Sequence, residues 1–430
     1  MADELRRFAG ASLVGVGRRI GLLGAALGLG QAFFYLVDFP ALYIASKALL
    51  PALALAMGMA ALLWRLRWGF AYPYATALLG ATAALAVLSA LTSAFYFGQP
   101  LFWGLWAQVK LAPVAFYVLS LYLLRRFAVS LREIAWSVSA AGALTVLAGL
   151  LLKLFADPAW FASAADGRFV LYDPIRGHRY NLYLPLLMLA LLYWAHQAYL
   201  SGKPRYILAT ASGLWVIAFV VQSRTALLGT LLGLGLGAWR YPAYRRLILF
   251  AVVGAWALFI GELVYFRPLE LLSALSLRLE TAARMWRELG EDSLRWLLGM
   301  GYLNPLWGRT LRDYYGEHFW TSDVGWLGIA FELGLVGVLL VGGFYVLLGR
   351  ALYRLPEGTS APLVRAFRDF FWVTVLLSPL VPNIPLHTGL YASLLAVAVY
   401  GSSAHAPPRS RRMGARHVSS RHPDQRFNPG

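Results

Sequence analysis

Residues 324–348 read VGWLGIAFELGLVGVLLVGGFYVLL, an apolar run in which Glu332 is the one charged residue. Such a run is typical of a transmembrane helix, because about twenty apolar residues cross the hydrocarbon core of a bilayer. Comparable runs recur along the whole chain, so we expect an all-α fold, a polytopic membrane bundle of about twelve transmembrane helices. The predicted spans are residues 20–37, 44–64, 73–96, 103–124, 134–155, 181–200, 205–222, 223–239, 247–266, 324–348, 367–384 and 386–400.

The composition excludes a soluble globular protein. Of the 430 residues, 60% are hydrophobic and 13% are charged, whereas soluble domains carry about 25% charged residues. The sequence contains no cysteine, which excludes disulfides, thiolate nucleophiles and cysteine-ligated metal sites. A formal net charge of +18 does not indicate a nucleic-acid partner, because positive residues accumulate in the cytoplasmic loops of membrane proteins.

The positions of the basic residues predict how the chain crosses the membrane. With the N-terminus in the cytoplasm, both termini and the cytoplasmic connections contain Arg or Lys, as the positive-inside rule requires. We therefore expect both termini to be cytoplasmic, with a membrane domain over residues 1–400. Residues 401–430 are rich in Pro, Ser, Arg and His, which predicts a basic, disordered cytoplasmic tail because too few apolar residues remain for a core.

The longest predicted connection is the outer loop, residues 267–322. Long connections without a span of their own are often functional. Within this loop, residues 269–298 place apolar side chains three and four positions apart among Arg and Glu. This spacing predicts helices that lie along the outer face of the membrane, where they contact membrane lipids.

Several arginines are predicted on the outer side, against the usual bias. Arg224 lies between two predicted spans, and Arg176 and Arg179 precede the span at 181–200. A guanidinium binds phosphate oxygens in a bidentate manner and stays charged at any working pH, so a pyrophosphate is the ligand that these residues favour. The alternative is that they reach lipid headgroups, as charged residues at the ends of spans often do.

Titratable side chains that precede the span at 324–348 are candidates for a general base. Asp323 is placed either to accept a proton or to cap the N–H groups at the start of that helix. Glu317 and His318 are nearby alternatives for the base. His387, near the outer end of the last two spans, indicates no function by itself.

Charged residues inside predicted spans are costly in hydrocarbon. Lys47, Lys110 and Glu332 are therefore expected to face the interior of the bundle or to pair, in a structural role. The Gly-Met-Gly turn at 299–301 is expected to end a helix near residue 298, because glycine adopts the backbone conformations that a helix stop requires.

Five short motifs follow one another in a characteristic order. They are Arg179-Tyr180-Asn181, Ser223-Arg224-Thr225-Ala226, Ser276-Leu277-Arg278, Gly299-Met300-Gly301 and residues 323–337, DVGWLGIAFELGLVG. Their order, spacing and predicted sidedness over roughly residues 170–345 resemble the O-antigen ligase and O-antigen polymerase superfamily.

The resemblance implies a membrane glycosyltransferase of the bacterial inner membrane whose active site faces the periplasm. Such an enzyme transfers glycan from an undecaprenyl pyrophosphate carrier to an acceptor hydroxyl, with no metal, cofactor or nucleotide sugar. It implies that Arg179 and Arg224 bind the pyrophosphate, that Arg278 orients the donor or the loop, and that a base near residue 324 accepts the proton. The outer loops contain no Asp-x-Asp pair for a divalent ion, which agrees with a metal-independent reaction.

One departure from the family pattern bears on the acceptor. Ligases of this family usually have His-Asn where this chain has Ser322-Asp323, and the missing histidine is their candidate base. We therefore expect a polymerase of O-antigen or exopolysaccharide repeat units, whose acceptor is another carrier-linked glycan. A ligase that transfers glycan to lipid A-core is the alternative, which His318 keeps open.

A lipid or sugar transporter, including a flippase, is the alternative of another class, because many transporters have twelve spans and both termini inside. Such transporters commonly consist of two related halves with a site near the middle of the membrane. This chain shows no related halves, and its longest loop follows the ninth predicted span. These features favour the glycosyltransferase.

Overall fold

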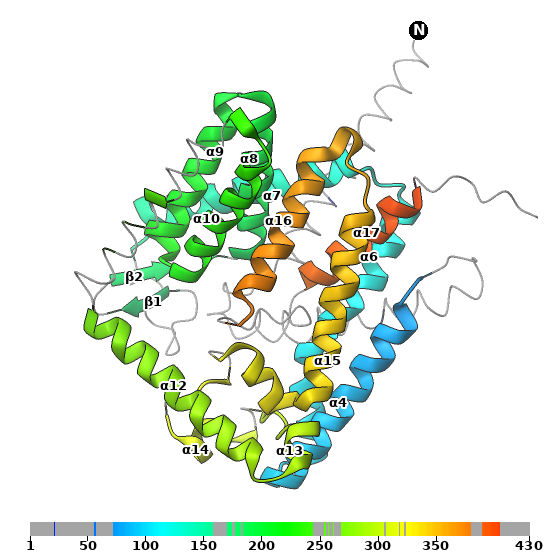
Figure 1. Cartoon of the computed structure of the whole chain (residues 1–430), viewed down its shortest axis with the longest axis vertical. Coiled ribbons are helices and arrows are strands. Elements are labelled where there is room, and N and C mark those ends of the chain that lie inside the picture. The colour runs from blue at the N-terminus through cyan, green and yellow to red at the C-terminus, as the bar shows by residue number, and fades with distance from the viewer. Residues whose placement is uncertain are drawn as a thin grey trace, which may run out of the picture.

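The computed structural model shows an all-α, multi-pass membrane bundle (Figure 1). The structure describes residues 21, 56, 72–157, 170–173, 177–180, 182, 184–243, 253–254, 257, 261, 268–304, 307–317, 319–321, 324–379 and 389–404. The predicted spans at 20–37, 44–64 and 247–266 lie almost wholly outside these ranges, as does the predicted tail at 401–430. The fold class is therefore confirmed, whereas the number of twelve spans stays a prediction.

Four of the described helices are long and apolar enough to cross a membrane. They are α4 (Ala75–Phe97), α7 (Leu131–Phe155), α9 with its π-helical continuation η4 (Pro204–Trp215 and Val216–Val221), and α15 (Gly325–Arg354). A further apolar segment is bent by 44° between α5 (Leu101–Ala107) and the helix that follows, which begins as the 3₁₀ helix η2 (Gln108–Ala115) and continues as α6 (Phe116–Arg126). This segment is either a broken span or a re-entrant loop. The shorter helices are α8 (Leu184–Ser201), α10 (Arg224–Trp239), α16 (Ala361–Leu377) and α17 (Gly389–Ala404).

Helix α8 lies at the centre of the described bundle, in contact with α7, α9, α10 and α16. Its residues 186–192 are all buried. Glycines allow the neighbouring helices to approach closely, because a Cβ on Gly142 of α7 would overlap Ala190, and one on Gly213 of α9 would overlap Leu191. Small residues have this role in membrane helix pairs generally. Large apolar side chains such as Phe95 and Leu339 are exposed on the outside, as expected for a surface that faces lipid.

The outer loop forms three helices, α12 (Pro268–Gly290), α13 (Ser293–Leu298) and α14 (Leu311–Tyr315), in the lower part of Figure 1. Helix α12 buries Met285 and Leu289 and exposes Leu279 and Trp286, so the predicted helical amphipathicity is confirmed. A two-stranded antiparallel hairpin, β1 (Val170–Asp173) and β2 (Gly177–Tyr180), was not predicted. Its strands have four residues each, too short a pattern to stand out in the sequence.

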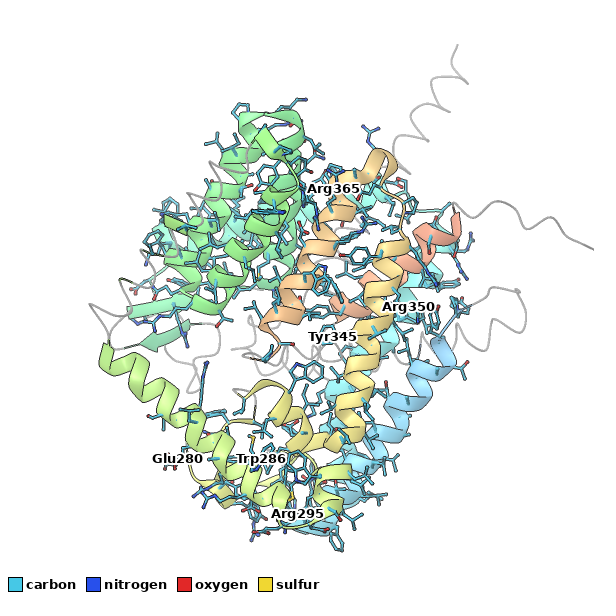
Figure 2. All side chains as sticks on the ribbon, viewed as in Figure 1. Glu280, Trp286, Arg295, Tyr345, Arg350 and Arg365 are labelled. Carbon is cyan, nitrogen blue, oxygen red and sulfur yellow. The ribbon has the colours of Figure 1, made fainter. Side chains whose placement is uncertain are left out.

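The two ends of the described bundle carry different contacts. At one end, Arg240 pairs with Asp369, and Gly401 lies against Leu131 and Leu355. At the other end, α13 contacts α4 and α15, and the Tyr314 hydroxyl donates to the Phe97 carbonyl. Figure 2 accordingly shows Glu280, Trp286 and Arg295 far from Arg365. Which connections lie on the cytoplasmic side stays a prediction.

Helix α15 is broken at Gly334, whose φ of 67° and ψ of −174° are not helical. The break leaves carbonyls without their usual N–H donors within the helix, and the outer loop supplies other donors. The Met300 N–H donates to the Phe331 carbonyl at 2.7 Å, and the Gly301 N–H donates to the Glu332 carbonyl at 3.1 Å. The Gly-Met-Gly turn ends α13 at Leu298, as predicted, and it also completes the broken helix.

Replacing Gly334 with alanine is expected to reduce the free energy of unfolding by at least about 2 kcal/mol, because a side chain is strained at this φ and its Cβ would overlap the Leu297 carbonyl. The matched control is Gly342→Ala in the same helix, where a Cβ would have no neighbour within 4 Å. Thermal unfolding of the purified protein in detergent measures both. Equal melting temperatures for the two variants would contradict the prediction.

Candidate functional site

Arg179 lies on β2, where it pairs in register with Leu171 of β1. The neighbouring Tyr180 is buried, which fixes this strand against the bundle. The Arg179 Nε atom is buried and has no hydrogen-bond partner among the residues that the structure describes. Because an unsatisfied buried donor costs about 1–3 kcal/mol, this N–H is suited to an anionic acceptor that is supplied from outside the chain.

Arg224 is the first residue of α10 and follows an unusual piece of backbone. The preceding η4 is a π-helix, and Gln222 adopts a left-handed conformation with φ 53°. Ser223 then caps α10, because its Oγ accepts from the Ala226 N–H at 3.3 Å. π-helical turns are rare and frequently mark functional sites, and the start of a helix favours negative charge.

The strand that carries Arg179 contacts the element that leads into Arg224. Strand β2 contacts η4, and Arg224 follows the end of η4 by three positions. Both side chains are partly buried. The start of α10 favours anions, and a shared phosphate site for Arg179 and Arg224 stays a prediction.

The other predicted site residues are more dispersed. Arg278 is exposed on α12, and Glu317 is exposed in the turn after α14. Arg176, His318, Asp323, Lys47 and His387 lie outside the described residues. The described part of the chain contains no group of three His, Cys, Asp or Glu side chains that could hold a metal ion.

Glu317 lines a cavity of about 110 Å³ between α12 and the segment after α14. Leu277, Glu280, Thr281, Arg284 and Tyr315 also line it. The Arg284 Nη1 atom donates to the Tyr315 carbonyl and joins the two walls. Two carboxylates, a hydroxyl and a guanidinium thus border one small space, a set of groups that hydrogen-bonds to hydroxyl-rich ligands and includes a possible proton acceptor.

A buried polar cluster confirms the predicted pairing of charges within the spans. Lys110 Nζ lies 2.5 Å from Glu332 Oε2, and it lies 3.6 Å from the centre of the Tyr302 ring. The other oxygen of Glu332 accepts from Thr321 Oγ1 at 2.5 Å. Every polar atom of the carboxylate is therefore used, as a buried charge requires.

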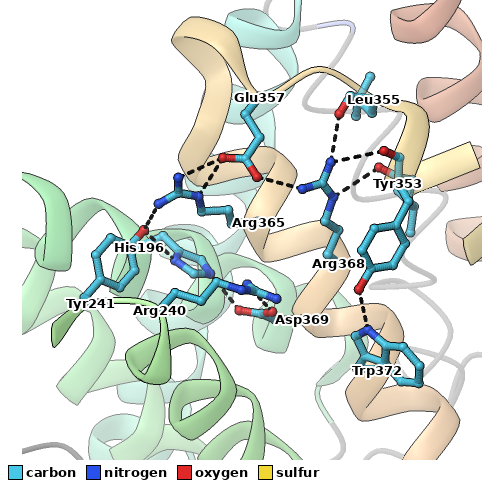
Figure 3. Close-up of polar contacts among 11 residues, drawn as sticks. His196, Arg240, Tyr241, Tyr353, Leu355, Glu357, Arg365, Arg368, Asp369 and Trp372 are labelled. Atoms are coloured by element: carbon cyan, nitrogen blue, oxygen red, sulfur yellow. Dashed lines mark hydrogen bonds and ion pairs between the residues drawn. The ribbon is translucent and has the colours of Figure 1, made fainter. Parts of the chain in front are cut away.

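A second polar cluster lies at the opposite end and was missed from the sequence (Figure 3). His196 Nε2 lies 2.8 Å from Asp369 Oδ2, and Arg240 Nη1 lies 2.5 Å from Asp369 Oδ1 as an ion pair. The Tyr241 hydroxyl lies 3.1 Å from His196 Nδ1 and accepts from Arg365 at 2.8 Å. One signal in the sequence could have indicated this cluster. The predicted spans 181–200 and 367–384 each contain a titratable residue, His196 and Asp369.

Glu357 extends this cluster into the connection between α15 and α16. Arg365 Nη2 and Arg368 Nη1 lie 2.8 Å and 2.6 Å from its two carboxylate oxygens. Partial burial raises the pKa of Glu357, but the hydrogen bonds and charges of these two arginines outweigh burial, so the pKa lies below its ordinary value. The carboxylate therefore stays ionised and joins the two arginines.

No protein-family model and no curated protein matches the chain. Among solved structures, a chain of a peptidoglycan synthase complex, from a study of the coordination of polymerization and crosslinking, is 17% identical. It aligns over 76% of this chain and 96% of that chain with a TM-score of 0.43. The rod shape determining protein RodA of Thermus thermophilus is 16% identical, with 78% and 97% coverage and a TM-score of 0.42. Similarity at this level assigns no activity, and neither structure is described as an O-antigen ligase or polymerase.

Proposed function

We propose that the protein is a membrane glycosyltransferase that polymerises glycan repeat units carried on undecaprenyl pyrophosphate, at the outer face of the bacterial inner membrane. The observation that carries this proposal is the buried, unpartnered Arg179 Nε on a strand in contact with η4, the element that leads into Arg224. A lipid pyrophosphate supplies anionic oxygens that can accept from the Arg179 Nε–H group. The multi-pass fold gives a lipid-linked substrate access from the bilayer.

The proposed reaction breaks the bond between the sugar C1 and the pyrophosphate oxygen. The acceptor hydroxyl oxygen forms a new bond to C1, its proton passes to a carboxylate, and the pyrophosphate leaves with the electron pair. Fixed guanidinium groups stabilise the negative charge that develops on the leaving oxygen, and preorganised stabilisation of this kind is often the largest contribution to catalysis. Asp323 is the proposed base, with Glu317 and His318 as alternatives, and Arg278 is proposed to orient the donor or the loop.

The test is elongation by the purified full chain in detergent. Carrier-linked repeat units alone, with no nucleotide sugar and no added metal, are expected to yield longer carrier-linked chains on a gel. A ligase would consume donor only when lipid A-core is supplied. A transporter would leave the glycosidic bonds unchanged in either mixture, which would refute the proposal.

The base can be identified by kinetics. Asp323→Asn is expected to lower kcat by about 10²–10⁴-fold with little change in donor KM, because proton transfer contributes this much to a chemical step. The matched control is Glu291→Gln, an exposed carboxylate of the outer loop that pairs with Arg295 and lies outside the cavity that Glu317 borders, and it is expected to retain activity within about threefold. A large loss in Glu317→Gln instead would place the base in that cavity. Equal losses in kcat and donor affinity for Asp323→Asn would indicate a helix cap.

A further inference from the structure

The Lys110–Glu332 pair contacts the outer loop at two separate points. Lys110, from the bent segment, lies against the face of Tyr302, and Glu332, from the outer turns of α15, accepts from the Thr321 hydroxyl. Glu332 is 6% exposed, so its charge is compensated by these neighbours rather than by water. The ion pair therefore links the bundle to both ends of the segment 302–321.

The segment between these two points carries the chemistry proposed for the loop. It contains α14 and the exposed Glu317, and Asp323 follows Thr321 by two positions in the sequence. The end at Tyr302 has further support, because the Gln99 Nε2 atom donates to the Tyr302 carbonyl at 3.2 Å and the Gly301 N–H donates to the Glu332 carbonyl. At the other end, the Thr321 hydroxyl donates to Glu332 of α15, and the nearby Phe319 ring packs against Phe331 of the same helix.

We infer that Glu332 is a positioning residue, which fixes through the Thr321 hydroxyl the outer-loop segment that presents the candidate bases, and that Lys110 holds the Glu332 carboxylate in place. The inference rests on the proposed function, which it deepens by naming residues that place the base. A hydrogen bond to a carboxylate is stronger and more directional than one between neutral groups. A carboxylate buried beside one fixed cation has little freedom to turn, so Thr321 is held in one position.

The sequence permits a direct readout of this contact, because it contains no cysteine. A single reporter cysteine is introduced by Ser322→Cys, next to Thr321. The rate at which maleimide modifies this cysteine then reports how firmly the segment 302–321 is held. Thr321→Val keeps the shape of the side chain but removes the hydroxyl, and Glu332→Gln removes the charge. Each is expected to raise the rate about tenfold, since a hydrogen bond to a charged group contributes about 1.5–3 kcal/mol. Thr321→Ser retains the hydroxyl and is expected to keep the original rate.

A second reporter, Ser403→Cys, controls for general loosening of the protein. Ser403 is exposed on α17, away from the outer loop, and its rate is expected to stay constant in all three variants. The inference is overturned if the rate at the first reporter does not rise, if Thr321→Ser behaves like Thr321→Val, or if both reporters accelerate equally.

Elongation assays then separate positioning from simple attachment. Thr321→Val is expected to lower kcat about tenfold while donor KM stays constant, and Thr321→Ser is expected to restore kcat. Normal elongation in Thr321→Val, despite faster modification, would overturn the positioning role. If the parent chain does not elongate glycan at all, the proposed function fails, whereas the modification rates still decide whether the Glu332–Thr321 contact holds the segment.

Discussion

Arg224→Ala is expected to reduce glycan elongation by about 10²–10³-fold, because removing one preorganised group that stabilises developing negative charge costs this much in kcat. Arg179→Ala is expected to cause a loss of similar size. Arg224→Lys should fall in between, since an ammonium keeps the charge but cannot bind two phosphate oxygens in the planar geometry of a guanidinium. Initial rates with carrier-linked repeat units measure all three variants.

The matched control is Arg205→Ala. Arg205 is exposed near the start of α9, at the end of that helix remote from η4, and bonds to the hydroxyl of its neighbour Tyr206. Its loss is expected to leave elongation unchanged. All variants should insert and accumulate like the parent chain. Full activity in both Arg179→Ala and Arg224→Ala would refute the proposed pyrophosphate site.

Asp369→Ala is expected to lower the free energy of unfolding by about 3–5 kcal/mol, the usual cost of removing one partner from a buried ion pair. Asp369 is 0% exposed, and its two oxygens face Arg240 and His196. Without the Asp369 carboxylate, the Arg240 guanidinium, about two-thirds of which is buried, loses its counter-charge. Denaturation of the purified protein, followed by helical circular dichroism, measures the change.

The matched control for Asp369 is Glu357→Gln in the same cluster. The Glu357 side chain is 34% exposed, so water screens its interactions with Arg365 and Arg368. Its replacement is expected to cost no more than about 1 kcal/mol, as for other partly exposed ion pairs. A larger loss in Glu357→Gln than in Asp369→Ala would contradict the interpretation that burial decides the strength of this cluster.

The sequence predicted the helices well because the bilayer imposes a simple rule. Where the structure describes them, the predicted spans correspond to one, two or three consecutive helices. The run at 205–222, for example, became α9 and η4. The interruptions were not predicted, because the 3₁₀ turns of η2, the π-helix η4 and the break at Gly334 depend on neighbouring segments rather than on hydropathy. Gly334 is one of several glycines in α15, and only its contacts with residues 297–301 identify it as the break.

The candidate site was predictable in part. Arg179 and Arg224 stood out because they go against the charge bias. Strand β2, which carries Arg179, contacts η4, which ends three positions before Arg224, and a shared site for the two arginines stays a prediction. The Lys110–Glu332 pair was expected as an interior pair, but its partner residues Thr321 and Tyr302 carry no signal in the sequence. His196 and Asp369 are 173 positions apart, and a contact over this separation follows from the packing of α8 on α16, which one sequence does not specify.

The break in α15 also has a consequence for biogenesis. Unpaired backbone carbonyls are costly in hydrocarbon, and residues 300 and 301, which satisfy those of Phe331 and Glu332, are synthesised before α15. The donors are therefore made ahead of the helix that needs them. Folding of α15 in its broken form should require the turn at residues 299–301 to be in place first, so a change that keeps this turn away from α15 would leave the helix straight and immature.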